Sequence, residues 1–184
     1  MSWDGLNQVA WLLVAALTVV AFYSLIKRMV RMTLDELNLV YGWLRFRWQM
    51  VITAAKVVVP IWALQFLIIC FWAKYPVMLQ WPWQGVSFTN LLLAWVEAPV
   101  LEEFLLRGLI FWFLRRQRGP VVATAVTAIV FGFSHAVRAV PALLFFIMSG
   151  VSLALVVERT KSLIPAMLVH SVQNVIVSTL GWGG

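Results

Sequence analysis

The hydrophobic positions of this chain form long apolar stretches separated by short polar segments. A transmembrane helix needs about 20 consecutive, mostly apolar residues. Six stretches reach or approach that length, at 9–26, 54–73, 90–114, 121–138, 140–157 and 162–180. The pattern therefore predicts an all-α, polytopic membrane protein with about six transmembrane helices.

The segment 32–49 has a different pattern. Charged residues such as Asp35, Glu36, Arg45 and Arg47 alternate there with leucine and aromatic residues. A helix with one charged and one apolar face lies in the membrane interface, so we expect an amphipathic interfacial helix. No repeat, low-complexity run or long linker divides the chain. Residues 1–184 are expected to form a single integral membrane domain.

Composition narrows the class of protein. Of the 184 residues, 63% are hydrophobic and 11% are charged, whereas soluble domains are about 45–50% apolar and about 25% charged. A chain of this length cannot bury so much apolar surface in a water-soluble core. A soluble enzyme and a disordered chain are therefore excluded. The single cysteine, Cys70, forms no internal disulfide and is expected to be a small buried apolar residue.

The basic residues predict the orientation. Eleven of the fourteen Lys and Arg residues lie between or at the ends of spans one and two, three and four, or five and six. Only Lys74 and Arg138 lie on the other side, and Arg107 is inside a span. Basic loops face the cytoplasm, which places both termini and the Trp81/Trp83 loop outside. Because topology accounts for the basic excess, no nucleic-acid partner is expected. The start of the chain lacks the features of a cleaved signal peptide, so we expect the first span to be retained.

The third span contains four ionisable residues, Glu97, Glu102, Glu103 and Arg107. Each such charge costs about 2.5–3.5 kcal/mol at a helix centre, so these residues need partners or water. Glu102 and Glu103 point to different faces of a helix, since neighbours differ by about 100°. Glu103 and Arg107 have the spacing of a favourable ion pair, which leaves Glu102 free. The alternative is that all of these charges form one structural network.

The two histidines lie in later spans. Phe131 is one turn before His135, and Asn174 is one turn after His170. Each histidine alone is typical of a buried core residue. Together with the carboxylates, however, they supply a base, two imidazoles and an amide donor, which are the parts of a hydrolytic site with an oxyanion pocket.

These residues form three ordered motifs on successive predicted spans. The motifs are Glu102-Glu103-x-x-x-Arg107, Phe131-x-x-x-His135 and His170-x-x-x-Asn174. Their order resembles the CPBP (Abi) family of CaaX proteases and bacteriocin-processing enzymes, and the resemblance covers residues 97–174. It implies a glutamate-dependent intramembrane endopeptidase that needs neither metal nor cofactor. Its implied partners are a membrane-anchored protein substrate and the lipid bilayer.

The resemblance also implies a role for each residue of the site. Glu102 is expected to be the general base for a water molecule that His135 helps to hold. His170 and Asn174 are expected to stabilise the tetrahedral oxyanion. The implied supporting residues, which brace the site, are Glu103, Arg107 and Phe131.

Glu97 and Pro99 are candidates for an access path. Pro99 should weaken the helical hydrogen bond at residue 95 and kink the third span, which opens room for water above Glu102. Glu97 lies nearer the outer end of that span, about 140° around the helix from Glu102. Pairing elsewhere and protonation are the other roles open to Glu97.

Other chemistries have less support. Ser134 and Ser171 each adjoin a histidine, but adjacent helical residues do not face each other. A zinc site from Glu102, His135 and His170 is chemically feasible, yet the chain has no His-Glu-x-x-His pair. A carrier or proton relay is disfavoured because the intramembrane charges are confined to the second half. A non-catalytic immunity or scaffold protein remains an alternative.

The expected depth of the site bears on the substrate. Glu102 lies about 18 Å below the outer end of its span, and His135 about 21 Å above the cytoplasmic end of its own. His170 and Asn174 lie about 12 Å and 18 Å up the last span. An outward-opening site fits the membrane-embedded C-terminal anchor of an exported protein, as in the sorting-signal (myxosortase-like) branch of the family. The alternative is a prenylated CaaX tail that arrives from the cytoplasm.

Overall fold

The computed structural model describes residues 20, 23–24, 45–72, 87–135 and 140–179. The chain divides into two units, residues 1–41 and 42–184. In the first unit, Val20, Tyr23 and Ser24 are helical. The rest of the predicted span 9–26, most of the predicted interfacial helix and the Trp81/Trp83 loop lie outside the described residues.

Every regular element in the described part of the second unit is a helix, which confirms the all-α class. In chain order the elements are α3 (Trp48–Trp72), α4 (Phe88–Leu92), the π-helix η1 (Leu93–Glu97), α5 (Ala98–Glu103), the π-helix η2 (Phe104–Phe111), α6 (Trp112–Ser134), α7 (Val140–Thr160) and α8 (Ile164–Thr179). Among the described residues, two segments are long and apolar enough to cross a membrane, Trp48–Ile68 and Val140–Thr160, and α8 is a shorter apolar helix. The count of six spans stays a prediction.

The start of α3 corrects the sequence prediction. Residues 45–47 are not helical, and the helix begins at Trp48 rather than at residue 54. The predicted end of the interfacial helix at residue 49 is therefore wrong. The apolar run after Trp48 continues past Lys56, whose exposed side chain has a long apolar stem that lets a charged head reach water from a membrane helix.

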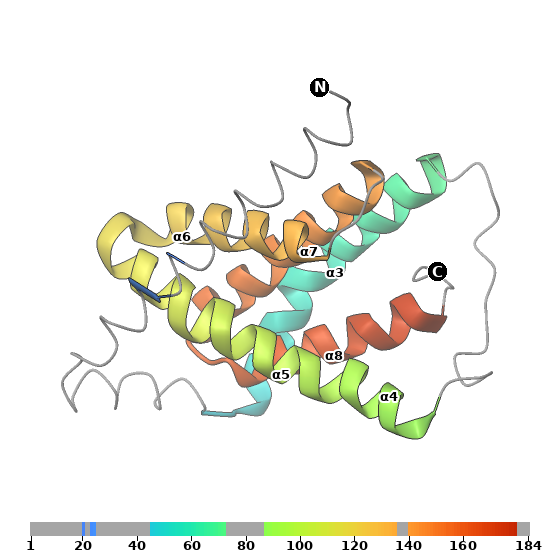
Figure 1. The fold of residues 1–184 in the computed structure, drawn as a ribbon, viewed down its shortest axis with the longest axis horizontal. Helices are drawn as coiled ribbons and strands as arrows, with labels where there is room; N and C mark the ends of the chain where they lie inside the picture. Colours follow the sequence, from blue (N-terminus) through green and yellow to red (C-terminus); the bar gives the residue numbers. More distant parts are fainter. Residues whose placement is uncertain (1–19, 21–22, 25–44, 73–86, 136–139, 180–184) are drawn as a thin grey trace. The chain divides into compact units, whose positions relative to one another are not determined.

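Residues 88–118 form one nearly continuous helical rod through α4, η1, α5, η2 and the first part of α6. The rod ends at Gly119, where φ is 83° and ψ is 172°. Glycine tolerates this left-handed φ because it has no Cβ, and Pro120 then begins a second helical part with its fixed φ. The chain reverses at this point (Figure 1), which agrees with the break predicted between the third and fourth stretches.

Helix α7 occupies the middle of the unit and packs against α3, α6 and α8 (Figure 1). Its approach to α6 depends on two glycines. A Cβ on Gly150 would lie 2.7 Å from the Cα of Ala128, and one on Gly132 would lie 2.4 Å from Ile147. Gly132 and Gly150 thus allow the two helices to approach each other closely.

Many apolar side chains of the unit face outward, especially along α3. Leu64, Phe66 and Leu67 are all exposed there. Cys70 is also exposed, so the prediction that it is buried is wrong. The expectation came from soluble proteins, in which exposed apolar groups meet water. On a membrane helix, hydrocarbon solvates the outer face, so an apolar thiol has no need of a protein core.

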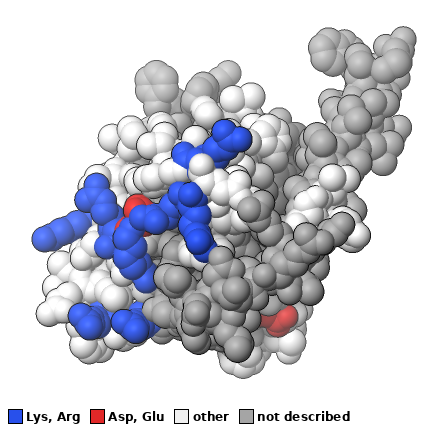
Figure 2. Space-filling view, turned by 90° about the vertical axis from the view of Figure 1, so that its left-hand side faces the viewer, with Lys and Arg blue, Asp and Glu red and all other residues white. Residues whose placement is uncertain are grey.

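Basic side chains gather at the end where α6 turns (Figure 2). The exposed or partly exposed basic residues of the described loops and helix ends there are Arg45, Arg47, Arg115, Arg116, Arg118, Arg159 and Lys161. Glu158 joins two of these segments, because its carboxylate accepts hydrogen bonds from Arg115 at 2.5 and 2.9 Å and from Lys161 at 2.5 Å. The hydrogen bond to Glu158 raises the pKa of Arg115. The Ser162 hydroxyl donates a hydrogen bond to the Arg45 carbonyl, which connects the residues before α3 to the residues between α7 and α8.

Candidate active site

An ion pair lies at the centre of the candidate site. Arg107 donates to Glu103 at 2.8 Å, and both side chains are fully buried. Arg107 also donates to the carbonyl of Gly150 on α7 at 3.1 Å, and its guanidinium lies 4.8 Å from the centre of the Phe131 ring. The pair predicted from spacing is therefore present, and it joins η2 to α5, α6 and α7.

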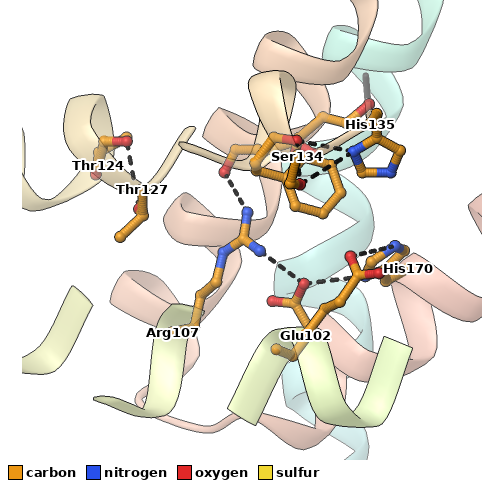
Figure 3. A network of polar contacts seen from close by, with 12 residues as sticks. Glu102, Arg107, Thr124, Thr127, Ser134, His135 and His170 are labelled. Carbon is orange, nitrogen blue, oxygen red and sulfur yellow. Dashed lines mark hydrogen bonds and ion pairs between the residues drawn. The ribbon is translucent and has the colours of Figure 1, made fainter. Parts of the chain in front are cut away.

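His170 connects this pair to Glu102. Its Nδ1 lies 3.0 Å from the same Glu103 oxygen that accepts from Arg107. Because a carboxylate only accepts, Nδ1 carries the hydrogen, and Nε2 points toward Glu102 at 4.0 Å. The contacts run from Arg107 to His170 with Glu102 beside them (Figure 3).

Glu102 differs from Glu103 because the His170 Nε2 atom that faces it lies 4.0 Å away, beyond hydrogen-bond distance. It is partly exposed and accepts no hydrogen bond from any described residue, and its Oε2 atom is buried. In the pair, Glu103 Oε2 and Arg107 Nε are also buried without a hydrogen bond, but the other oxygen of Glu103 is occupied twice. The helical phase separates the two carboxylates as the sequence predicted.

His135 lies at the end of α6 as its C-cap, with φ −80° and ψ 0°. The predicted span continues to residue 138, but residues 136–139 lie outside the described part. Its Nδ1 lies 2.7 Å from the Phe131 carbonyl, so Nδ1 carries the hydrogen and Nε2 of the neutral ring is an acceptor. The ring stacks on Phe146 at 3.9 Å. The cap geometry and the stacking together fix the direction of Nε2.

Phe131 contacts three members of the site. In addition to the guanidinium of Arg107, its ring centre lies 4.6 Å from that of His135 and 5.3 Å from that of His170. The side chain itself is 1% exposed. One aromatic ring therefore separates the two imidazoles and holds each at a defined angle.

Asn174 compensates for a break in the rod. The Ala98 N–H donates to the carbonyl of Leu93, five residues back. In that register the next donor would be Pro99, which has no N–H, so the Ala94 carbonyl lacks a donor. The Asn174 amide donates to it at 2.8 Å. An α-helix would leave the carbonyl of residue 95 without a donor, as the sequence predicted. The π-helical register instead leaves the carbonyl of Ala94, one residue earlier.

The structure brings together Glu102, His135 and His170, whereas the contact of Asn174 is with the Ala94 carbonyl. Glu97 is exposed and Pro99 is buried, and neither joins the ionic cluster. Three described residues that the sequence analysis missed are Phe146, Ser149 and Gly150. Phe146 is one of many apolar residues, so its sequence position gives no indication of a role. Gly150 acts through its backbone carbonyl, which every residue has. Ser149, however, is a polar residue inside an apolar stretch, and that feature could have indicated a role.

In the described part of the chain, no group of three His, Cys, Asp or Glu side chains is arranged to hold a metal ion. Both histidines already use Nδ1 for an oxygen acceptor. The Nε2 atoms of both histidines, the Glu102 carboxylate and the second amide hydrogen of Asn174 remain available to a ligand or to water.

The segment that contains the candidate site matches the model of a known protein family. The model of the type II CAAX prenyl endopeptidase Rce1-like family matches residues 83–176. Neither a curated protein nor a solved structure matches the chain. The matched segment is about half of the chain and contains all of the candidate site residues. The chain therefore belongs to the Rce1-like family of type II CAAX prenyl endopeptidases, which are proteases embedded in membranes.

Proposed function

We propose that this protein is an intramembrane endopeptidase that hydrolyses a peptide bond in or near the membrane-embedded C-terminal segment of a protein substrate. In this proposal, Glu102 activates the attacking water, and neither a metal nor a cofactor takes part. The observation that carries the proposal is the pairing of Glu103 with Arg107, which leaves the adjacent Glu102 carboxylate uncommitted.

The proposal gives His170 the role of oxyanion donor. Its Nδ1 lies 3.0 Å from Glu103 Oε1, and its Nε2 lies 4.0 Å from Glu102 Oε2. An imidazole with a hydrogen on both nitrogens donates from Nδ1 to Glu103 and presents Nε2–H beside the base. In this form His170 donates to the oxyanion next to the water that Glu102 activates.

The proposed reaction begins with a water molecule held between Glu102 and the acceptor Nε2 of His135. Glu102 takes one proton as the water oxygen attacks the peptide carbonyl carbon. The carbonyl oxygen becomes an oxyanion that receives hydrogen bonds from His170 Nε2–H and from the second amide hydrogen of Asn174. Glu102 then gives its proton to the leaving nitrogen, the oxyanion re-forms a C=O bond, and the C–N bond breaks. An amine and a carboxylic acid are released, and the acid loses its proton to the solvent.

The depth of the site supports an outward-facing opening. Glu102 is thirteen residues from Arg115, or about 20 Å along the rod from the basic end, and His170 is about 12 Å from Ser162. His135, about 22 Å from Pro120, lies at the far end of α6. With the basic end in the cytoplasm and both termini outside, a C-terminal anchor of an exported protein reaches such a site.

Hydrolysis of a prenylated CaaX tail is the second candidate function, and the description of the matched family favours it. The two substrates enter from opposite sides. In a Cys70→Ser background, Ala98→Cys should be labelled only from outside, and Arg118→Cys, at the basic end, only from the cytoplasm. Labelling of both cysteines from the cytoplasm would favour the prenylated substrate.

The function itself is tested by comparing the C-terminal peptides of membrane proteins in cells with wild-type protein and in cells with Glu102→Gln. We expect new C-termini, generated near membrane anchors, only with the wild-type protein. A carrier, a proton relay or a non-catalytic immunity or scaffold protein would leave the two sets of peptides identical.

A further inference from the structure

A second set of buried polar side chains lies next to the ionic cluster. Gln65 of α3 donates from its amide nitrogen to the Ser149 hydroxyl and to the Phe145 carbonyl of α7, each at 2.8 Å. Gln173 of α8 donates to the same hydroxyl. Ser149 in turn donates to the Phe145 carbonyl at 2.9 Å. One hydroxyl thus fixes three helices, and the three polar side chains are each at most 6% exposed.

Gln65, Ser149 and Gln173 form what we call the polar clamp. Two of its members, Ser149 and Gln173, are next in sequence to residues that make contacts in the site. Ser149 immediately precedes Gly150, whose carbonyl binds Arg107. Gln173 lies one turn after His170 and immediately before Asn174 on α8. A rotation or slide of α8 that moves the Gln173 amide away from Ser149 therefore also moves His170 away from the carboxylates.

The polar clamp is not the most stable way to fill this part of the interior. The Oε1 atoms of Gln65 and Gln173 are both buried without a hydrogen-bond partner, and unpartnered buried polar atoms cost free energy. Apolar side chains of similar volume would avoid that cost, but they would not select one register between helices. Buried polar pairs are known to fix register in packed helices at a cost in stability.

We propose that Gln65 is a positioning residue that acts through Ser149 and Gln173 to hold His170 and Asn174 in register with the carboxylates of α5. This inference rests on the proposed function for its chemical meaning. Gln65 lies outside the segment that the family model matches, residues 83–176. Helix α3, which carries Gln65, thereby contributes to the site without touching the substrate.

The test compares Ser149→Ala with Ser152→Ala. Both serines lie on α7, both are fully buried, and both hydroxyls donate to a carbonyl of their own helix. Only Ser149 also accepts from Gln65 and Gln173. The chain has two histidines, so histidine-selective ¹⁵N labelling of the detergent-solubilised full chain reports on His170 with little overlap. We expect Ser149→Ala to displace the His170 signals and Ser152→Ala to leave them at the wild-type positions.

A kinetic measurement uses a fluorogenic peptide with a hydrophobic C-terminal segment in micelles. We expect Ser149→Ala to lower kcat about tenfold and to leave KM within about twofold, because misplaced catalytic groups slow chemistry. The NMR readout needs no activity, so a peptide that the wild-type protein does not cleave counts against the proposed function only. The positioning role is overturned if Ser149→Ala leaves the His170 signals unchanged or if both serine variants displace them equally.

If Ser149→Ala does not fold, the same measurement is made on the single variants Gln65→Met and Gln173→Met. Methionine has about the length of glutamine but cannot donate to Ser149. Each should displace the His170 signals in the same direction, and the double variant should displace them no further than the larger single effect. Wild-type His170 signals in both folded variants would overturn the proposal.

Discussion

The described part of the unit contains two clusters of paired charges that have the same chemistry and different surroundings. At the basic end, Arg115 and Lys161 pair with Glu158, and their side chains are 35%, 54% and 19% exposed. In the interior, Arg107 and Glu103 pair at 0% exposure. Water and salt screen the first cluster. The second has only protein around it, so every charge in it must be balanced within the cluster.

This difference explains why chemistry is expected in the interior. At the basic end, an unsatisfied oxygen is solvated and has no special reactivity. In the interior, the Glu102 carboxylate is close to a charged pair and to His170, yet it accepts no hydrogen bond from a described residue. The following predictions test whether burial and the free carboxylate, rather than ion pairing as such, distinguish the two clusters.

The largest effect is expected from Glu102→Gln. The amide has the shape of the carboxylate but cannot accept a proton from water, so peptide cleavage should fall by about 10²–10⁴-fold. The protein should remain folded, because Glu102 has no hydrogen bond to a described residue to lose. Peptide cleavage and the thermal unfolding temperature in detergent are measured side by side. Cleavage at the wild-type rate by the variant would remove Glu102 from the mechanism.

The next largest effect is expected from breaking the buried pair. Glu103→Ala or Arg107→Ala leaves one buried charge without its partner, which typically costs about 3–5 kcal/mol of stability. Replacing both residues with apolar ones should cost less than either single change. Denaturation in detergent measures all three variants. If both single variants are as stable as the wild type but inactive, the pair acts in the chemistry and not as a brace.

The outcome at these residues shows what a sequence can reveal about such a site. The division of roles between Glu102 and Glu103 followed from helical phase, because a helix fixes the direction of each side chain. The bond to the Gly150 carbonyl could not be predicted, since backbone oxygens carry no sequence signal. Asn174 was expected to face an oxyanion, but one of its hydrogens fills the Ala94 carbonyl. That carbonyl is free only because a π-helical register meets Pro99.

The fold was predictable to a similar extent. The all-α class and the break between the third and fourth stretches followed from the apolar pattern, whereas the exact position of the reversal at Gly119 was not predicted. The start of α3 did not, because the alternation before Trp48 resembles an amphipathic helix and gives no signal for the non-helical residues 45–47. Burial of Cys70 was mispredicted because outer and inner faces are both apolar in a membrane helix. Hydrophobicity alone therefore does not distinguish the lipid face from the core.

A smaller effect is expected at the basic end. Glu158→Gln weakens two partly exposed ion pairs, so stability should change by no more than about 1 kcal/mol, and the change should shrink as salt is raised. Activity should stay near that of the wild type. The same denaturation measurement at low and high salt checks this. A loss as large as that of Glu103→Ala would mean that burial does not distinguish the two clusters.

The smallest effect is expected from removing metal ions. A zinc ion would need the Glu102 carboxylate and the Nε2 atoms of His135 and His170 as ligands, but no three His, Cys, Asp or Glu side chains of the described residues are arranged to hold a metal ion. These Nε2 atoms suit roles as water acceptor and oxyanion donor. We therefore expect strong chelators to leave peptide cleavage unchanged in the purified protein, with metal content measured on the same samples. Stoichiometric zinc in the active protein, with activity lost on its removal and regained on its return, would replace the glutamate-activated water with a metal-activated one.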